Sequence, residues 1–224
     1  MTFSSRVVLI SAMLTVSLPA LAQILGCGDP LRRDGGYGPF DYTDPVHYRE
    51  KLPIVDQNHF TPNVENLRGG ATEAGYNNPK AVAGDLRYTL MAFPNHHRAL
   101  ASMIRLSFKE NKPKPDGQRF TVECWLDRAI RWRPEDGTVR MLYGNYLSHA
   151  KIKRYDEAIA QYKKAEDALT NQKTMGNLYY NMGLLYFNKK DYEKARDFAN
   201  KAYARGFPLS GLKEMLVRAG KWQG

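Results

Sequence analysis

Small side chains recur at fixed distances among bulky ones in the stretch YYNMGLLYFNKKDYEKA, residues 179–195. Tyr179, Gly183 and Tyr186 follow one another at spacings of four and three, which places them on one face of a helix. The polar residues 188–191 then predict a turn, and Ala195 and Ala202 continue the pattern beyond it. We expect two antiparallel helices whose small side chains let the backbones approach closely, with aromatic rings filling the space beside them.

The same pattern occurs again upstream. Gly144 begins a second copy, which continues with a Tyr-Asp-Glu-Ala run at residues 155–158. Its glycine and tyrosine lie two residues further apart than in the later copy, which predicts a longer turn around residues 150–153. A weaker third copy ends at Pro134, with Leu126 at the aromatic position and a first helix expected over residues 85–108. Residues 109–118, KENKPKPDGQ, are typical of an exposed loop.

These copies resemble the tetratricopeptide repeat, a helix-turn-helix unit of about 34 residues. The last copy departs from the family pattern at Ala199, where a large aromatic side chain is usual, and we expect Phe198 to take its place. The resemblance implies an all-α solenoid of about three helical hairpins over residues 85–224. The positions that this architecture packs together are Gly144, Ala158, Tyr162, Ala165, Gly183, Tyr186, Tyr192, Ala195 and Ala202.

A capping helix is expected after the last hairpin. Pro208 stops the preceding helix, and Ser210 is placed to cap a final amphipathic one over residues 211–222. Its apolar face carries Leu212, Met215, Leu216 and Ala219.

Residues 23–84 differ in composition and periodicity from the repeats and predict an irregular N-terminal arm. The stretch around residues 34–42 is rich in glycine and aromatic side chains and has no sustained helical period. One short helix is expected after Thr61, with Pro62 at its first position. Because aromatic rings bury large areas, the arm packs either against its own helices or against a neighbouring molecule.

The first 22 residues are typical of a signal peptide. A single basic residue, Arg6, precedes a short apolar run that ends in Ala20-Leu21-Ala22. We therefore expect cleavage between Ala22 and Gln23, and export of the mature chain to the periplasm or the cell exterior. Residues 24–27, Ile-Leu-Gly-Cys, offer a rival lipoprotein processing site, but Leu25 is large for its position.

Export changes the interpretation of the two cysteines, Cys27 and Cys124, since an oxidising compartment joins such pairs. With only two cysteines the connectivity is forced, and a disulfide would clamp the arm onto the helical body. The alternative is two free thiols. No CxxC or nearby histidine at ligand spacing accompanies them, which disfavours metal binding.

Few residues in the chain indicate catalysis. No GxSxG, phosphate-binding glycine loop or HExxH pattern occurs. His96 and His97 are adjacent, so on a helix they point about 100° apart and do not bind one ion from the same face. The simpler interpretation is that Asn95 or Pro94 starts a helix and the histidines hydrogen-bond the loop. His59 would add a third ligand only if the arm folded over this helix, so we expect no metal, no cofactor and no enzyme.

Charge is distributed unevenly along the chain. Residues 128–224 hold 19 Lys and Arg against 10 Asp and Glu, while residues 1–127 hold 14 against 13. A basic surface favours acidic partners such as an anionic polysaccharide, lipid headgroups or an acidic protein segment. Export removes the usual nucleic-acid targets.

The resemblance also implies a binding groove, because first helices of tetratricopeptide arrays commonly line a concave surface that holds peptides. The groove positions carried over from the family are Met141, Asn145, Ser148, Asn177, Tyr180, Asn181, Leu184 and Asn188. Amide side chains among them suit an extended peptide backbone. The basic side chains with which some family members clamp a terminal carboxylate are missing from these places.

Three functional hypotheses follow. The first is an exported, non-enzymatic scaffold that binds another envelope or extracellular protein. The second is a subunit that assembles into a filament through exchange of the N-terminal arm. The third is an enzyme that uses His59, His96 and His97. The segments LRYTLMAFPNHHRALASMIRL and GPFDYTDP also resemble stretches of exported tetratricopeptide proteins of Gram-negative bacteria, a resemblance that supplies no activity.

Overall fold

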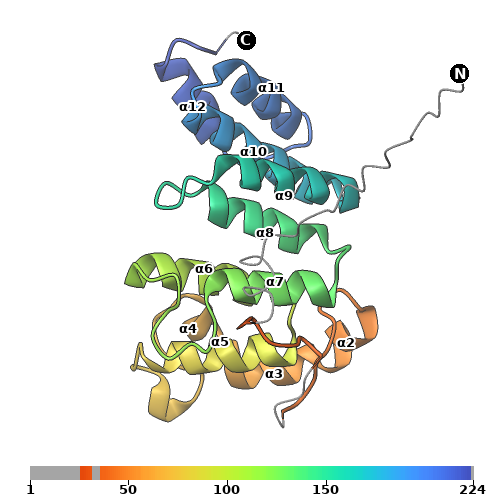
Figure 1. The fold of residues 1–224 in the computed structure, drawn as a ribbon, viewed down its shortest axis with the longest axis vertical. Helices are drawn as coiled ribbons and strands as arrows, with labels where there is room; N and C mark the ends of the chain where they lie inside the picture. The colour runs from red at the N-terminus through yellow and green to blue at the C-terminus, as the bar shows by residue number, and fades with distance from the viewer. Residues whose placement is uncertain (1–25, 32–35, 223–224) are drawn as a thin grey trace, which may run out of the picture.

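The computed structural model describes residues 26–31 and 36–222, and these residues fold into helices joined by turns and loops (Figure 1). No strand occurs in these two ranges. The predicted signal peptide, residues 1–22, lies outside them, as do two of the four residues of the rival lipoprotein site. The elements are α2 (Pro45–Glu50), α3 (Leu52–His59), α4 (Pro62–Glu65), the 3₁₀ turn η1 (Glu73–Gly75), α5 (Ala81–Ala92), α6 (His97–Glu110), α7 (Val122–Trp132), α8 (Gly137–Ser148), α9 (Tyr155–Ala168), α10 (Gln172–Asn188), α11 (Tyr192–Tyr203) and α12 (Gly211–Arg218).

Consecutive helices pack as hairpins, which confirms the predicted helical repeat. α8 packs along α9, and α10 packs along α11, while α6 and α7 form a more open pair. The hairpins follow one another along the long axis of the molecule, and α12 closes the far end against α10 and α11 (Figure 1). The longer turn predicted in the second copy is present between Ser148 and Tyr155.

Glycines permit the close approach of the two helices in each of the last two hairpins. A Cβ atom at Gly144 would lie less than 3.0 Å from three atoms of the Tyr162 ring. A Cβ atom at Gly183 would lie less than 3.0 Å from Leu212 and 3.2 Å from the carbonyl oxygen of Ala195. The alanines of the facing helices are fully buried, as expected: Ala158, Ala165, Ala195, Ala199 and Ala202.

Aromatic rings fill the space beside these small residues. Tyr186 stacks on Phe198 with ring centres 5.5 Å apart, and Phe198 lies 5.9 Å from the ring of Tyr179. Phe198 is therefore the large aromatic side chain of the second helix, beside the buried Ala199. Tyr192 contacts Phe187 edge to face across the turn.

The prediction of a single helix over residues 85–108 is wrong, because the chain forms two helices there. α5 ends at Ala92, and Phe93 leaves the helical conformation with φ −130° and ψ 88°. Pro94 explains the break, since proline disfavours helix at the residue before it and supplies no backbone N–H. α6 then starts after His96 and ends at Glu110, where Asn111 adopts a left-handed conformation. The loop predicted over residues 109–118 spans residues 111–121, because Lys109 and Glu110 still belong to α6.

The arm is more regular than expected. Asp44 caps α2 by accepting hydrogen bonds from the backbone N–H groups of Val46 and His47, with Pro45 at the first helical position. α3 follows at once and buries Leu52 and Val55. The Asp-Pro pair was the available signal, because aspartate favours the N-cap and proline the first turn. The short helix predicted after Thr61 is confirmed as α4.

The last helix differs from its prediction in three details. α12 ends at Arg218, before the predicted Trp222, and Ala219 is exposed. Ser210 occupies the N-cap position, but its hydroxyl donates to Glu214 Oε1 at 2.6 Å and caps no backbone group. Leu212 and Leu216 are buried, as expected.

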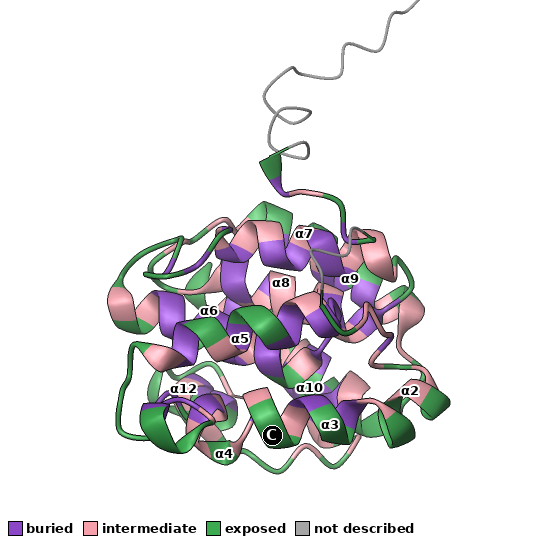
Figure 2. Cartoon of the chain, turned by 90° about the horizontal axis from the view of Figure 1, so that it is seen from below, coloured by how far each residue is buried: buried purple, intermediate pink, exposed green. Residues whose placement is uncertain are grey.

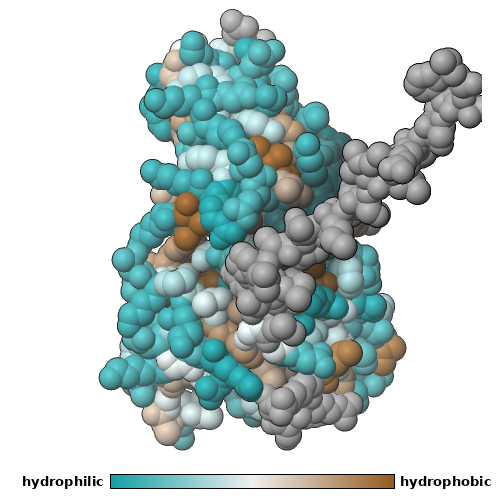
Figure 3. Space-filling view, in the orientation of Figure 1, coloured by the Kyte–Doolittle hydropathy of each residue, from teal (hydrophilic) through white to brown (hydrophobic). Residues whose placement is uncertain are grey.

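One continuous apolar core runs through the molecule. It extends from Phe60 and Val64 of the arm to Leu216 of α12, and a smaller cluster joins Leu52 and Val55 to Phe93. Seen from below, the helices turn their buried residues inward and their exposed residues outward (Figure 2). The face drawn in Figure 3 is mostly hydrophilic, with small separate hydrophobic patches. The arm thus packs against its own helices, the first of the two alternatives.

Candidate partner-binding groove

Amide side chains form a row along one face of α10. Asn177, Asn181 and Asn188 are spaced at helical intervals, and Leu184 lies between the last two. Asn177 and Asn188 are exposed, while Asn181 is half-buried and its amide nitrogen donates to the Asn177 side-chain oxygen at 3.2 Å. The amide nitrogen of Asn177 forms no hydrogen bond with the described residues. The arrangement presents polar donors and acceptors around one aliphatic side chain.

The predicted groove residues of α8 are engaged within the chain. The Tyr162 hydroxyl donates to the Asn145 side-chain oxygen at 2.8 Å, and the Ser148 hydroxyl donates to the Asn145 carbonyl oxygen at 3.2 Å. Burial raises the pKa of Tyr162, so its hydroxyl keeps its proton and remains a donor. Asn145 and Ser148 therefore fix the α8–α9 hairpin, and the Asn145 amide nitrogen is the group left for a ligand.

Two of the predicted groove residues belong to the core. Met141 is 3% exposed and Tyr180 is 9% exposed. The Tyr180 ring stacks on Phe207 at 4.3 Å, beneath the segment that leads to α12. Neither side chain offers contact area to a ligand in an open groove, because neighbouring segments already cover both.

Electrostatics distinguish the first helices of these hairpins from the rest of the chain. α8 and α10 contain no Asp or Glu, and their charged residues are Arg140 and Lys173. Arg140 donates to the Pro134 carbonyl oxygen and to Gln161, whereas Lys173 is exposed. An extended segment lying along this face meets amides, aliphatic groups and positive charge.

Comparison with protein-family models places a tetratricopeptide repeat at residues 176–205. The match covers α10 and α11, the hairpin that carries Gly183, Ala195 and Ala202. This segment is a tetratricopeptide repeat. No curated protein and no solved structure matches the chain.

Helices α5 to α9 lie between the arm and the tetratricopeptide repeat, and the repeat pattern is weaker in their sequence. At their junction Asn95, which is fully buried, donates hydrogen bonds to two carboxylates, Asp41 at 2.8 Å and Asp136 at 3.0 Å. Its side-chain oxygen accepts the backbone N–H of Tyr42 at 3.0 Å. Asn95 thus links the arm, the α5–α6 loop and the start of α8. Arg133 pairs in turn with Asp41. We name Asp41, Tyr42, Asn95, Arg133 and Asp136 the junction cluster.

The carboxylates of the junction cluster have further partners. Asp41 pairs with Arg133, and Asp136 accepts from His97 Nε2 at 2.8 Å and caps α8. Burial raises the pKa of Asp41, but hydrogen bonds from Arg133, Thr43 and Asn95 together hold it below its usual value. The ionised form of Asp41 is therefore favoured.

His96 and His97 serve structure at this junction. His96 is fully buried: its Nδ1 accepts the backbone N–H of Ala99, and its Nε2 lies 3.0 Å from Asp56. Burial lowers the pKa of His96, against the opposite effect of Asp56. The histidines bind carboxylates of other segments, beyond the loop contacts that we predicted.

His59 does not join them, although the arm does fold over α6. It stacks on Tyr88 and pairs with Asp85 at 3.0 Å. Within the described parts of the chain, no group of three or more His, Cys, Asp or Glu is arranged to hold a metal ion. Sequence patterns did not reveal the junction cluster, because Asn95 lies 41 or more residues from each residue with which its side chain forms a hydrogen bond.

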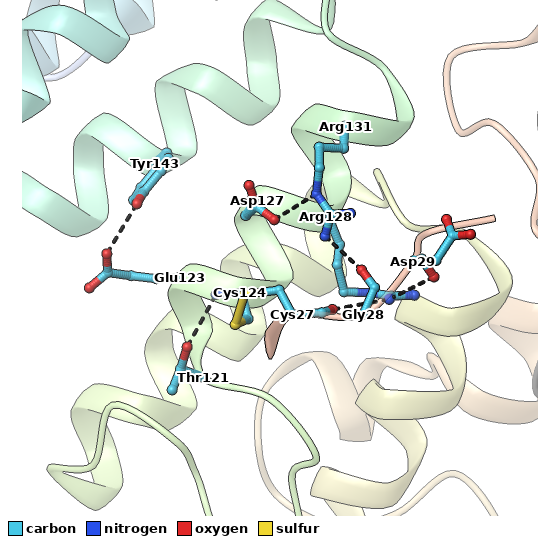
Figure 4. Close-up of a disulfide and its surroundings, with 10 residues drawn as sticks. All are labelled: Cys27, Gly28, Asp29, Thr121, Glu123, Cys124, Asp127, Arg128, Arg131 and Tyr143. Atoms are coloured by element: carbon cyan, nitrogen blue, oxygen red, sulfur yellow. Dashed lines mark hydrogen bonds and ion pairs between the residues drawn. A yellow bond between two sulfur atoms is a disulfide. The ribbon is translucent and has the colours of Figure 1, made fainter. Parts of the chain in front are cut away.

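The disulfide between Cys27 and Cys124 attaches the start of the arm to α7, as predicted (Figure 4). Two arginines of α7 hold the same segment. Arg128 donates to the carbonyl oxygens of Cys27 and Asp29, and Arg131 donates to that of Gly28 at 2.7 Å. Among the described residues, none of the helices has both the length and the apolar composition that a membrane span requires.

Proposed function

We propose that this chain is an exported scaffold that holds an extended segment of another envelope or extracellular protein along α10 and α8. The observation that carries the proposal is the row formed by Asn177, Asn181, Leu184 and Asn188 on helices that contain no acidic residue. Amide side chains hydrogen-bond a peptide backbone, Leu184 supplies an apolar contact, and the positive charge favours an acidic or neutral segment. The scaffold needs no reaction centre.

Export is part of this proposal and rests on the predicted signal peptide. The disulfide supports it, because such bonds persist in oxidising compartments. It also opposes lipidation at Cys27, since the sulfur atom that would carry the lipid is bonded to Cys124.

The arm-exchange alternative has less support. Leu52, Val55 and Phe60 of the arm are already buried against the chain's own helices, whereas other apolar side chains of the arm, such as Tyr48 and Ile54, are exposed. The disulfide, Arg128 and Arg131 hold the first residues of the arm in place. An arm exchanged between copies would have to break this set of contacts. We therefore favour the scaffold over the filament subunit.

The test is selection of binding segments from a displayed library of random 12-residue peptides, followed by affinity measurement with two variants. Asn177→Ala combined with Asn181→Ala should weaken the selected peptides by about tenfold or more, because each lost hydrogen bond removes roughly 1 kcal/mol. Asn200→Ala, an exposed amide on α11, is the matched control and should bind as the wild type does. Equal affinity for all three proteins, or selection of mainly basic peptides, would refute the proposal.

A further inference from the structure

A cavity of about 450 Å³ lies outside the tetratricopeptide repeat, and none of its lining residues belongs to the junction cluster. Its walls come from the arm, α5, α6 and the loop that joins α6 to α7, which lie together at the left of the lower half in Figure 1. Small-molecule sites commonly enclose about 300–1,000 Å³. The apolar part of the lining is Leu67, Pro79, Ala83 and Leu106. The cavity is thus large enough for a small ligand and separate from α8 and α10.

Two lysines face this cavity with unused hydrogen-bond donors. Lys109 Nζ donates to the Leu67 carbonyl oxygen at 3.1 Å, which uses one of its three N–H groups. The Lys80 ammonium group has no hydrogen bond or ion pair with the described residues. The two side chains therefore offer several N–H donors beside an apolar surface.

The acidic residues of the lining already have donors of their own. Both oxygens of Asp116 accept from Lys112 Nζ, at 2.7 and 2.6 Å. Glu110 Oε2 accepts the backbone N–H of Asp116 at 2.7 Å. These contacts hold the loop and direct the carboxylates to partners outside the lysine pair. Lys80 and two of the three N–H groups of Lys109 are thus left without an acceptor among the described residues.

We propose that this cavity binds a small aliphatic carboxylate. The carboxylate accepts hydrogen bonds from Lys80 and Lys109, and the aliphatic chain lies against Leu67, Ala83 and Leu106. Charged hydrogen bonds of this kind contribute more than neutral ones, and the apolar walls add hydrophobic burial. Because the lining joins the arm to α6, bound ligand also stabilises the docked arm by mass action.

The probe for this proposal is octanoate, with octanol and octylamine as compounds of the same chain length that lack the negative charge. Octanoate should bind saturably to the purified chain in isothermal titration and raise its melting temperature, while the two analogues bind at least tenfold more weakly. Octanol or octylamine binding as tightly as octanoate would overturn the proposal. Absence of saturable octanoate binding at millimolar concentration would overturn it too.

Two variants locate the site. Lys80→Gln removes the charge at an exposed position and should weaken octanoate binding about tenfold. Lys114→Gln, at an exposed lysine of the α6–α7 loop outside the lining, should leave the affinity unchanged. Ala83→Leu places a larger side chain in the cavity and should abolish binding in a protein that circular dichroism shows to be folded. Unchanged octanoate affinity in Lys80→Gln would refute the assignment. The Asn177→Ala, Asn181→Ala variant should bind octanoate normally, so this test and the peptide test fail independently.

Discussion

The last two hairpins and the arm junction are held together in different ways. In the hairpins, Gly144 and Gly183 let helices meet closely, and the interface is mainly apolar packing, to which the Tyr162–Asn145 hydrogen bond adds a polar contact in α8–α9. At the junction, a buried amide, carboxylates, a histidine and a disulfide join segments that lie far apart in the chain. Packing between neighbouring helices follows a local rule that repeats, whereas the junction depends on a few particular pairs.

This difference decides which changes each region tolerates. A buried polar group costs little while its partners are present and a great deal when one is removed. An apolar interface responds to volume instead, so it tolerates exchange of one aliphatic group for another and resists added bulk. The predictions below use this contrast.

The largest effect should come from removing the disulfide. Cys27→Ser with Cys124→Ser opens a loop of 97 residues, and closing a loop near this length stabilises a folded protein by up to about 4.7 kcal/mol in the chain-entropy model. We expect a loss of about 2–5 kcal/mol in the free energy of unfolding, measured by urea denaturation. Wild-type protein in reductant should behave in the same way. An unchanged midpoint would mean that Arg128 and Arg131 alone anchor the arm.

Removal of the junction amide should come next. Asn95→Ala removes one donor from each of Asp41 and Asp136 and the acceptor of the Tyr42 N–H, all in a buried site. We expect a loss of about 3 kcal/mol in the free energy of unfolding. The control is Asn58→Ala, whose amide donates only to Ile54 within its own exposed helix, and it should change stability by less than about 0.5 kcal/mol. Similar values for the two variants would show that the junction is not held by its polar contacts.

Smaller changes in stability, of opposite sign, are expected when each of two glycines is replaced by alanine. Gly144→Ala forces a methyl group into the Tyr162 ring and should destabilise the protein by about 1–3 kcal/mol. Gly84→Ala, in the middle of α5 with no atom near its would-be Cβ, should stabilise it by about 0.5–1 kcal/mol. Thermal unfolding of both variants measures the pair. Stabilisation by Gly144→Ala would show that the hairpin has room to spare.

The smallest effect at neutral pH concerns His96. Because its pKa in the folded protein is lowered by burial, the unfolded chain takes up a proton first as pH falls below about 6.5. The contribution of His96 to stability should therefore be fully present above this pH and be lost progressively as the pH falls below it. His96→Asn keeps an acceptor at the N-cap of α6 but does not titrate, so the decline should be shallower.

Melting temperatures of the wild type and His96→Asn across pH 5–8 measure this contribution. His59→Asn, at a half-exposed histidine, is the control and should leave the dependence in place. Parallel curves for the wild type and His96→Asn would contradict the role assigned to the buried ring.

Much of the C-terminal half was predictable from local patterns. The spacing of Gly183, Tyr186 and Ala195 identified a hairpin that the structure and the family comparison both place at this segment. The cysteine pair was also predictable, because two cysteines allow one pairing. The helix predicted over residues 85–108 ran through the break at Phe93, because the apolar period continues on both sides of Pro94. The interpretation of His96 and His97 did place a helix start at Pro94 or Asn95, close to the observed start of α6 at His97.

The candidate groove was only partly accessible from sequence. The exposed amides of α10 lie on one face, as helical spacing requires, but Met141 and Tyr180 proved to be buried. Family positions specify which side of a helix a residue occupies. They do not specify whether a neighbouring segment, such as the one carrying Phe207, covers that side.

The sequence by itself determined the helices of the repeats, their turns and the contacts between adjacent helices, because helical periodicity and small-residue spacing act over a few turns of chain. Only the tertiary structure decided how the arm docks, which amides stay exposed and where the lysine-lined cavity forms. These features join Asn95 to Asp41 and Asp136, and place Lys80 and Lys109 in the lining of one cavity, across long stretches of chain. No local pattern encodes such pairs, since their energy depends on burial and geometry that exist only after folding.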